Sequence, residues 1–253
     1  MKTLGIDFGA SFVDAVIFDG KKITAKKSVI KNQYSPEWLK QFPQTDRVVT
    51  TGGRAKKKLK FVNEFECLGR GGLWLAKLKS AVVVSCGTGT AVIWARKNQP
   101  TVHLGGTGVG GGTIQGLGQL LLKTKAVEEV FQLAVKGNKT QVDLTVGDIL
   151  GQGIGLLPPE ATAANFGKLS SIQKEDLAQS LIGMVAETIG LVSCLGASHT
   201  GEKKIVFTGR VSTNKLVQKY LTQVCNLFKL SPVFPNQAEC ATALGAAIFA
   251  VAD

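Results

Sequence analysis

The feature that most constrains this chain is the glycine-rich segment HLGGTGVGGGTIQGLGQLLL at residues 103–122. Its glycines end abruptly in an apolar run. Glycine loses more backbone freedom on folding than any other residue, so such a cluster is kept where the chain bends unusually or a ligand approaches the backbone. Before an apolar helix, free N–H groups and the helix dipole favour an anion. The segment therefore predicts an anion site at a helix start, with a flexible hinge as the alternative.

A second glycine turn follows the predicted N-terminal strand, in GIDFGAS at residues 5–11. Asp7 stands at the end of this strand, and residues 9–11 can offer backbone N–H groups to a phosphate. The carboxylate can hold a divalent cation that neutralises phosphate charge. An ordinary Asp-x-Gly hairpin turn is the alternative interpretation.

Two more glycine turns occur further along the chain. In SCGTGT, residues 85–90, Gly87 and Gly89 interrupt what we interpret as one buried strand, which predicts either a structural bulge or a close approach of the backbone to a ligand. In IVFTGR, a strand ends at Gly209, where a ligand ring could lie against the backbone. No Gly-Lys-Ser/Thr and no dinucleotide fingerprint accompanies these glycines. Together, the turns and Asp7 predict a cleft for the phosphates of a nucleotide.

The order of predicted elements indicates the α/β class, because strands and helices alternate along the chain. Three neighbouring strands are expected before residue 30, with a turn at Asp19-Gly20, and a long apolar helix over residues 171–198. We expect two lobes, residues 1–104 and 105–253, with a cleft between them. The composition, 44% hydrophobic and 19% charged, can supply a sizeable core.

Composition and charge exclude several other classes. The net charge is +12, but apart from GRAKKKLK at residues 53–60 the lysines are spread out, and no zinc-finger or RNA-binding pattern occurs, so we expect no nucleic-acid partner. The five cysteines form no CxxC pair, which is typical of reduced thiols. No apolar run reaches the roughly 18 residues of a membrane helix. We therefore expect a cytoplasmic protein without a signal peptide or a membrane partner.

These motifs resemble those of a known superfamily. The order of a first phosphate turn, a second phosphate turn and an adenosine turn is similar to that of sugar kinases, actin and Hsp70. Over essentially its whole length the chain resembles type II pantothenate kinases, with GGTGVGGGTIQGLG and TAANFGK as the most specific pieces. The other matching segments, in that family's order, are VTTGGRA, NEFECLGRGG, VSCGTGT, DLTVGDIL, EATAANFGK and ALGAAI.

The resemblance implies a fold and an activity. The fold would be a two-lobed, actin/Hsp70/sugar-kinase-like α/β fold, with mixed sheets flanked by helices and a nucleotide cleft between the lobes. The activity would be transfer of the γ-phosphate of ATP, with Mg²⁺, to the 4′-hydroxyl of pantothenate, the first step of coenzyme A biosynthesis. The family is dimeric through helices of its second half, so a homodimer is expected.

The resemblance also implies roles for individual residues. The general base falls on Glu64 of NEFEC rather than on Glu66, and would accept the proton of the substrate hydroxyl; a solvent-exposed helix carboxylate is the alternative. Pantothenate would lie by residues 87–89, that is Gly87, Thr88 and Gly89, and by His103. ATP would contact Asp7, which is also the metal ligand, Phe8, Gly9, Ala10, Ser11, Phe12, Thr88, Gly110, Gly111, Gly112, Thr113, Ile114, Gln115, Gly209 and Arg210.

The chain departs from the family pattern in two places. Relatives carry an arginine where this chain has His103, and a neutral imidazole is a weaker partner for negative charge. Arg96, Lys97 or Arg70 could supply the missing cation. The first motif reads DFGAS rather than DxGGT, with Ser11 keeping the hydroxyl. Two other functions stay open: a sugar or amino-sugar kinase of the same superfamily, and a catalytically weak nucleotide-binding regulator.

Overall fold

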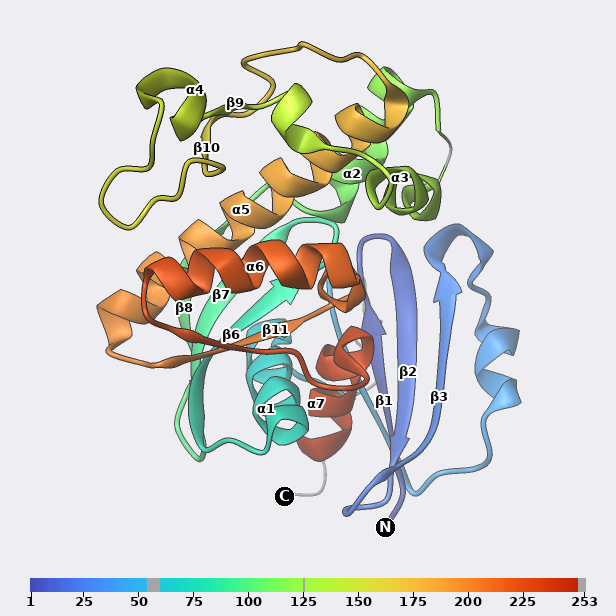
Figure 1. Ribbon diagram of the computed structural model, residues 1–253. Helices are drawn as coiled ribbons and strands as arrows, with labels where there is room; N and C mark the ends of the chain where they lie inside the picture. The colour runs from blue at the N-terminus through green and yellow to red at the C-terminus, as the bar shows by residue number, and fades with distance from the viewer. Residues whose placement is uncertain (54–59, 125, 250–253) are drawn as a thin grey trace.

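Two five-stranded mixed sheets form the framework of the chain (Figure 1). The computed structural model describes residues 1–53, 60–124 and 126–249. Of the basic stretch at 53–60, residues 54–59 lie outside the described ranges. The first sheet has the order β3-β2-β1-β4-β5 and the second β12-β11-β6-β7-β8. The α/β class and the two mixed sheets flanked by helices are as expected.

The first sheet contains the predicted meander, since β1, β2 and β3 are antiparallel neighbours. β4 then joins β1 in parallel, which places Thr51 beside Asp7 at the same edge of the sheet. Alternating apolar residues such as Ile6 and Val13 bury one face. The strands are β1 Thr3–Phe8, β2 Phe12–Phe18, β3 Ile23–Ile30, β4 Arg47–Thr51 and β5 Lys60–Phe61.

The second sheet is built around a hairpin. The apolar run before Cys86 is buried on both faces, and Cys86 pairs with Thr90 across the turn. The prediction of one interrupted strand was therefore wrong: the glycines at 87 and 89 make a tight turn between two antiparallel strands. The strands are β6 Ser80–Cys86, β7 Thr90–Arg96, β8 Val102–Thr107, β11 Lys204–Thr208 and β12 Ser231–Val233.

Two helices, α1 (Glu64–Ala76) and α7 (Ala241–Phe249), pack against each other between the sheets (Figure 1). Helix α1 contacts β6 and β7 of the second sheet, and α7 contacts β1, β2 and β4 of the first. Their backbones approach closely at Gly71 and Gly245, where an added Cβ would lie 1.8 Å from the Ala241 carbonyl oxygen and 1.7 Å from that of Cys67. Asn63 caps α1 by accepting hydrogen bonds from the two following free N–H groups, at Phe65 and Glu66.

The other face of the second sheet is covered by α5 (Lys174–Thr200) and α6 (Lys215–Leu227). By length and composition α5 could cross a membrane, but 61% of its most apolar window is buried inside the protein, as in the core helix of a globular domain. Beyond one end of this layer lie α2 Gly111–Leu117, α3 Val127–Ala134, α4 Val146–Leu150, β9 Leu144–Thr145 and β10 Thr162–Ala164 (Figure 1). The short turns are the π-turn Gly118–Leu122 and the 3₁₀ turns Lys31–Gln33, Pro36–Gln41, Lys139–Gln141, Val211–Thr213 and Ala238–Cys240.

The two sheets do not correspond to the two predicted lobes, because the predicted join at residues 104–106 falls inside β8. Strands β6, β7 and β8 share a sheet with β11 and β12, and α7 returns to the first sheet. The chain thus passes from one sheet to the other through α1 and comes back at its last described helix.

Candidate active site

Two predicted phosphate turns, one from each sheet, meet directly. The turn at 9–11 follows β1, and the turn at 87–89 joins β6 to β7. The Oγ atom of Ser11 lies 2.8 Å from Oγ1 of Thr88, so the two hydroxyls share a hydrogen bond. Residues 77 positions apart in the sequence are thereby brought to one place.

The glycine-rich segment packs onto the second of these turns. The N–H groups of Gly111 and Gly112 donate to the carbonyl oxygens of Gly87 and Thr88, each at 2.8 Å. A Cβ added at Gly110 would lie 2.8 Å from the Thr88 carbonyl oxygen. The expectation of free N–H groups was therefore wrong at Gly111 and Gly112, because both donate within the protein. The glycines are needed there for close approach of two backbone segments.

The other predicted ligand residues at the start of α2, which are Thr113, Ile114 and Gln115, have different environments. Thr113 Oγ1 accepts a hydrogen bond from the N–H of Gly110 at 3.2 Å and closes the first turn. Ile114 is fully buried in the core, so its side chain holds α2 in place and is not open to a ligand. Gln115 is exposed.

Asp7 is the most perturbed acid of the site. Burial raises its pKa to about 7, helped by the negative charges of Glu64 and Asp14 and opposed by Arg210 and Lys31. A buried carboxylate without enough positive charge around it holds its proton more tightly. The effect of the Glu64 charge on Asp7 indicates that the predicted metal ligand and the predicted base lie near each other.

The surroundings of Asp7 fit a divalent cation. Its Oδ1 atom is buried and has no hydrogen-bond partner among the described residues. Gly52, at φ +91°, keeps the space beside it open, since a Cβ there would lie 2.8 Å from this oxygen. Magnesium ions commonly use one or two carboxylates together with substrate phosphates. Within the described ranges no group of three or more His, Cys, Asp or Glu side chains could hold a metal by itself, so the phosphates would complete the coordination.

The two acidic residues at the start of α1 have different environments. Glu64 is the first residue of the helix, and partial burial raises its pKa although the residue stays accessible at the surface. Glu66 instead accepts a hydrogen bond from the N–H of Thr101 at 2.8 Å and so ties α1 to the chain before β8. Of the two, Glu64 is the carboxylate with an electrostatic effect on Asp7.

His103 lies near Glu64 but away from the turn at 87–89. Its imidazole stacks on Phe65, with ring centroids 4.5 Å apart and planes 10° apart. Thr107, not His103, pairs with Thr90 beside the turn. His103 and Thr107 are four positions apart, roughly 13 Å along β8.

The three arginine or lysine residues considered as substitutes for the missing cation are elsewhere. Arg96 pairs with Ser80, six positions from the turn and about 20 Å along the hairpin, and Lys97 follows it. The guanidinium of Arg70 stacks on the ring of Phe249 at 3.7 Å. The hairpin carries residues 96 and 97 away from its own turn, while Ile93, three positions before Arg96, pairs with His103. The choice of a substitute cation stays a prediction.

The predicted adenosine turn follows β11. Gly209 has φ +84°, and a Cβ there would lie 2.5 Å from the carbonyl oxygen of Cys86, so only glycine fits. The guanidinium of Arg210 donates to both carboxylate oxygens of Asp14, at 3.0 and 2.6 Å, and lies 3.8 Å over the ring of Phe12. Arg210 therefore links the second sheet to the first through its side chain.

Sequence reasoning missed Lys31. Its Nζ atom donates to the carbonyl oxygen of Gly9 at 2.6 Å, and its N–H donates to that of Ser11 at 2.9 Å. The register of the meander was the available signal, since Ile30 pairs with Phe12, the residue directly after the first phosphate turn.

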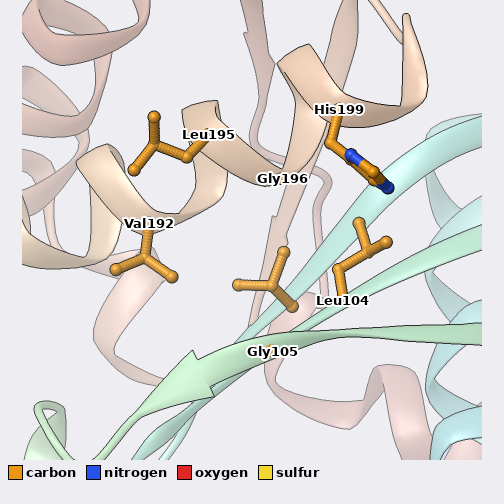
Figure 2. A pocket seen from close by; sticks show the side chains of 7 residues that line it. Leu104, Gly105, Val192, Leu195, Gly196 and His199 are labelled. Carbon is orange, nitrogen blue, oxygen red and sulfur yellow. The ribbon is translucent and has the colours of Figure 1, made fainter.

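A hollow lies on the face of the second sheet that α5 covers (Figure 2). Its volume is about 280 Å³, and it separates α5 from β7 and β8. The lining is apolar apart from one imidazole, so it offers little to a triphosphate. It is formed by Val92, Leu104, Gly105, Val192, Leu195, Gly196 and His199.

Known proteins of similar structure share the whole architecture. The activator of 2-hydroxyisocaproyl-CoA dehydratase from Clostridium difficile with bound ADPNP superimposes with a TM-score of 0.70 at 18% identity, over 99% of this chain and 94% of that one. A ROK family glucokinase from Streptomyces griseus in complex with glucose and AMPPNP gives a TM-score of 0.67 at 12% identity, over 100% of both chains. At these identities the similarity shows the fold, which is that of the sugar kinases and related ATPases.

Comparison of sequences identifies the family to which the chain belongs. The family model described as Fumble matches residues 77–248. A type II pantothenate kinase of Oceanobacillus iheyensis is 32% identical over 97% of this chain and 98% of its own length. A type II pantothenate kinase of Bacillus cereus (strain AH820) is 30% identical over 98% and 97%. The chain therefore belongs to the Fumble family, and within it to the type II pantothenate kinases.

Proposed function

We propose that this protein transfers the γ-phosphate of ATP to the 4′-hydroxyl of pantothenate, the first step of coenzyme A biosynthesis. The observation that carries the proposal is the pair of partly desolvated carboxylates, Asp7 and Glu64, beside two turns joined by the Ser11–Thr88 hydrogen bond. Membership of the family supports the choice of substrate.

Asp7 and the two phosphate turns would have different roles in the transfer. Asp7 would hold Mg²⁺, and a bound Mg²⁺ would neutralise negative charge on the phosphates. The turns at 9–11 and 87–89 position the triphosphate through main-chain groups and the hydroxyls of Ser11 and Thr88. Phosphoryl transfer depends mainly on such positioning and on fixed charges.

Glu64 would act as the general base. Burial raises its pKa above that of an ordinary glutamate, which moves it towards the working pH and makes it a better proton acceptor. Glu64 stands at the capped N-terminus of α1, so its backbone position is fixed. It takes the proton from the pantothenate hydroxyl as that oxygen attacks phosphorus.

Pantothenate would lie between Glu64 and the turn at 87–89, with His103 at the far side of the site. The stacked Phe65–His103 pair supports this placement, because Phe65 directly follows Glu64 in the first turn of α1. A ring N–H of His103 would donate to the substrate carboxylate.

We further propose a cytoplasmic homodimer formed by the second half of the chain. Large apolar side chains are exposed there, on α5 and on the segment after β9, and exposed apolar groups of this extent often mark interfaces. They are Ile149, Leu150, Ile154, Leu156, Leu157, Leu191 and Leu195.

The test is a substrate panel with purified protein, ATP and Mg²⁺. Phosphorylated pantothenate, detected by mass spectrometry, is the expected product, with no phosphorylated glucose or N-acetylglucosamine. Phosphorylation of a hexose alone would make this a sugar kinase. Binding of ATP without any phosphorylated product would make it a nucleotide-binding regulator.

A further inference from the structure

We propose that Lys31 binds the terminal phosphate of the nucleotide and supplies the fixed positive charge of the transfer step. The inference rests on the proposed function, because it assumes a triphosphate on the turn at 9–11. It arises from the charges that act on Asp7: among the described residues, the carboxylates of Glu64 and Asp14 raise its pKa, and the cations Arg210 and Lys31 lower it. A terminal phosphate adds further negative charge to this place.

Of the two cations, Arg210 is already paired with a carboxylate. It makes two hydrogen bonds to Asp14, whose side chain is only 10% exposed, and it stacks on Phe12. Moving this guanidinium to a phosphate would leave a buried carboxylate unpaired, which is costly. Arg210 therefore stays as a link between the sheets.

The ammonium group of Lys31 can donate more hydrogen bonds than it makes among the described residues. An ammonium group has three N–H donors, and the structure assigns one of them, to the carbonyl oxygen of Gly9 at 2.6 Å. A carbonyl is a neutral acceptor, and no carboxylate within residues 1–53, 60–124 and 126–249 forms an ion pair with Lys31 as Asp14 does with Arg210. The residue is partly exposed and can be reached by a ligand.

The position of Lys31 is fixed from two directions. Its N–H donates to the carbonyl oxygen of Ser11, and its Nζ donates to that of Gly9, so main chain and side chain both hold the same turn. A cation at the phosphate turn thus needs little reorganisation when the nucleotide binds, which is the condition for strong electrostatic stabilisation.

A purely structural role, bracing the turn through Gly9, is the competing explanation, and a comparison of nucleotides separates the two. Lys31→Met and Lys31→Arg are titrated calorimetrically with Mg²⁺ and either ADP or a non-hydrolysable ATP analogue. Lys27→Met is the matched control, since Lys27 lies on β3 but donates to Gln41 at 2.9 Å. Thermal melting of each variant without nucleotide reports on bracing.

Contact with the terminal phosphate predicts that Lys31→Met weakens the ATP analogue about tenfold or more while ADP changes about threefold or less, as expected for loss of a charge-assisted hydrogen bond. Lys31→Arg should recover most of the affinity, and Lys27→Met should match the wild type. Equal losses for both nucleotides, or no loss, would overturn the inference and leave the proposed function standing. Wild-type protein that binds neither nucleotide would overturn both.

Discussion

The hydroxyl groups of Ser11 and Thr88 lie 2.8 Å apart and join a turn of the first sheet to a turn of the second. Each turn is held by further contacts of its own: Lys31 holds the first, and the amides of Gly111 and Gly112 hold the second. The hydrogen bond therefore joins two turns, each of which is held in place by further contacts of its own.

Thr88→Val should weaken nucleotide binding and catalysis more than it weakens the fold. The change removes a hydroxyl that bonds Ser11 and keeps the β-branched shape. A neutral hydrogen bond contributes about 1 kcal/mol, so we expect a loss of kcat/KM for ATP of about fivefold or more, with Thr88→Ser close to wild type. Steady-state kinetics with melting curves measure both effects. Equal kinetic loss in the Ser and Val variants would show that the hydroxyl is not what matters.

Glu64→Gln should abolish turnover while ATP still binds, because the amide cannot accept a proton. General-base catalysis contributes about 10²- to 10⁴-fold, so kcat should fall by at least about 100-fold. Initial rates and calorimetric ATP titration give the two quantities.

Glu66→Ala is the matched control on the same helical turn. It loses the hydrogen bond from Thr101 and should lower the free energy of unfolding by about 1 kcal/mol with kcat largely kept. If Glu66→Ala stops turnover and Glu64→Gln does not, the two carboxylates have been assigned the wrong way round.

Asp7 should make the protein less stable as pH rises. Its pKa is raised in the folded state, from 3.8 to about 7. Between these values the folded state binds more protons than the unfolded state, so stability falls as pH increases from about 4 to about 7. Asp7→Asn should remove this slope and raise the melting temperature at pH 7.5 by several degrees, while activity is lost. Melting without Mg²⁺ or nucleotide at a series of pH values tests it, and an unchanged slope in the variant would rule out Asp7 as its source.

Gly110→Ala should disturb the second phosphate turn. The new Cβ would lie 2.8 Å from the Thr88 carbonyl oxygen and 2.9 Å from that of Gly87. Overpacking of this kind costs about 1–3 kcal/mol, and the backbone shift should also weaken ATP binding. Gly108→Ala is the control, since nothing lies within 4 Å of its added Cβ. Similar melting temperatures and ATP affinities for the two variants would show that the close approach at Gly110 is not needed.

Local sequence patterns predicted the elements but not all of their partners. Alternation and the Asp19-Gly20 turn predicted the meander, and the glycine turns predicted where the two sheets meet. Residues 102–107 were not predicted as a strand, because β8 contains two glycines, which favour turns over strands. Without β8, the second sheet was incomplete in the prediction, so the distance of Arg96 from the turn at 87–89 did not follow from the sequence.

The candidate site was predictable where a residue's role depends on its own chain neighbours. Asp7 stands at a strand end, which is a local feature, whereas Glu64 was chosen from the resemblance of NEFEC to the family motif. Lys31 and the Arg210–Asp14 pair depend on strand register and on contacts 196 residues apart. Such contacts follow from packing of the two sheets and leave no local pattern.

The most direct test is a single-turnover reaction with γ-labelled ATP, Mg²⁺ and pantothenate, comparing the wild type with Glu64→Gln. We predict that the wild type moves the label to pantothenate, whereas the variant retains bound, unreacted ATP. Label transferred at the same rate by both proteins, or no transfer to pantothenate by the wild type, would contradict the assignment of Glu64 as the base of a pantothenate kinase.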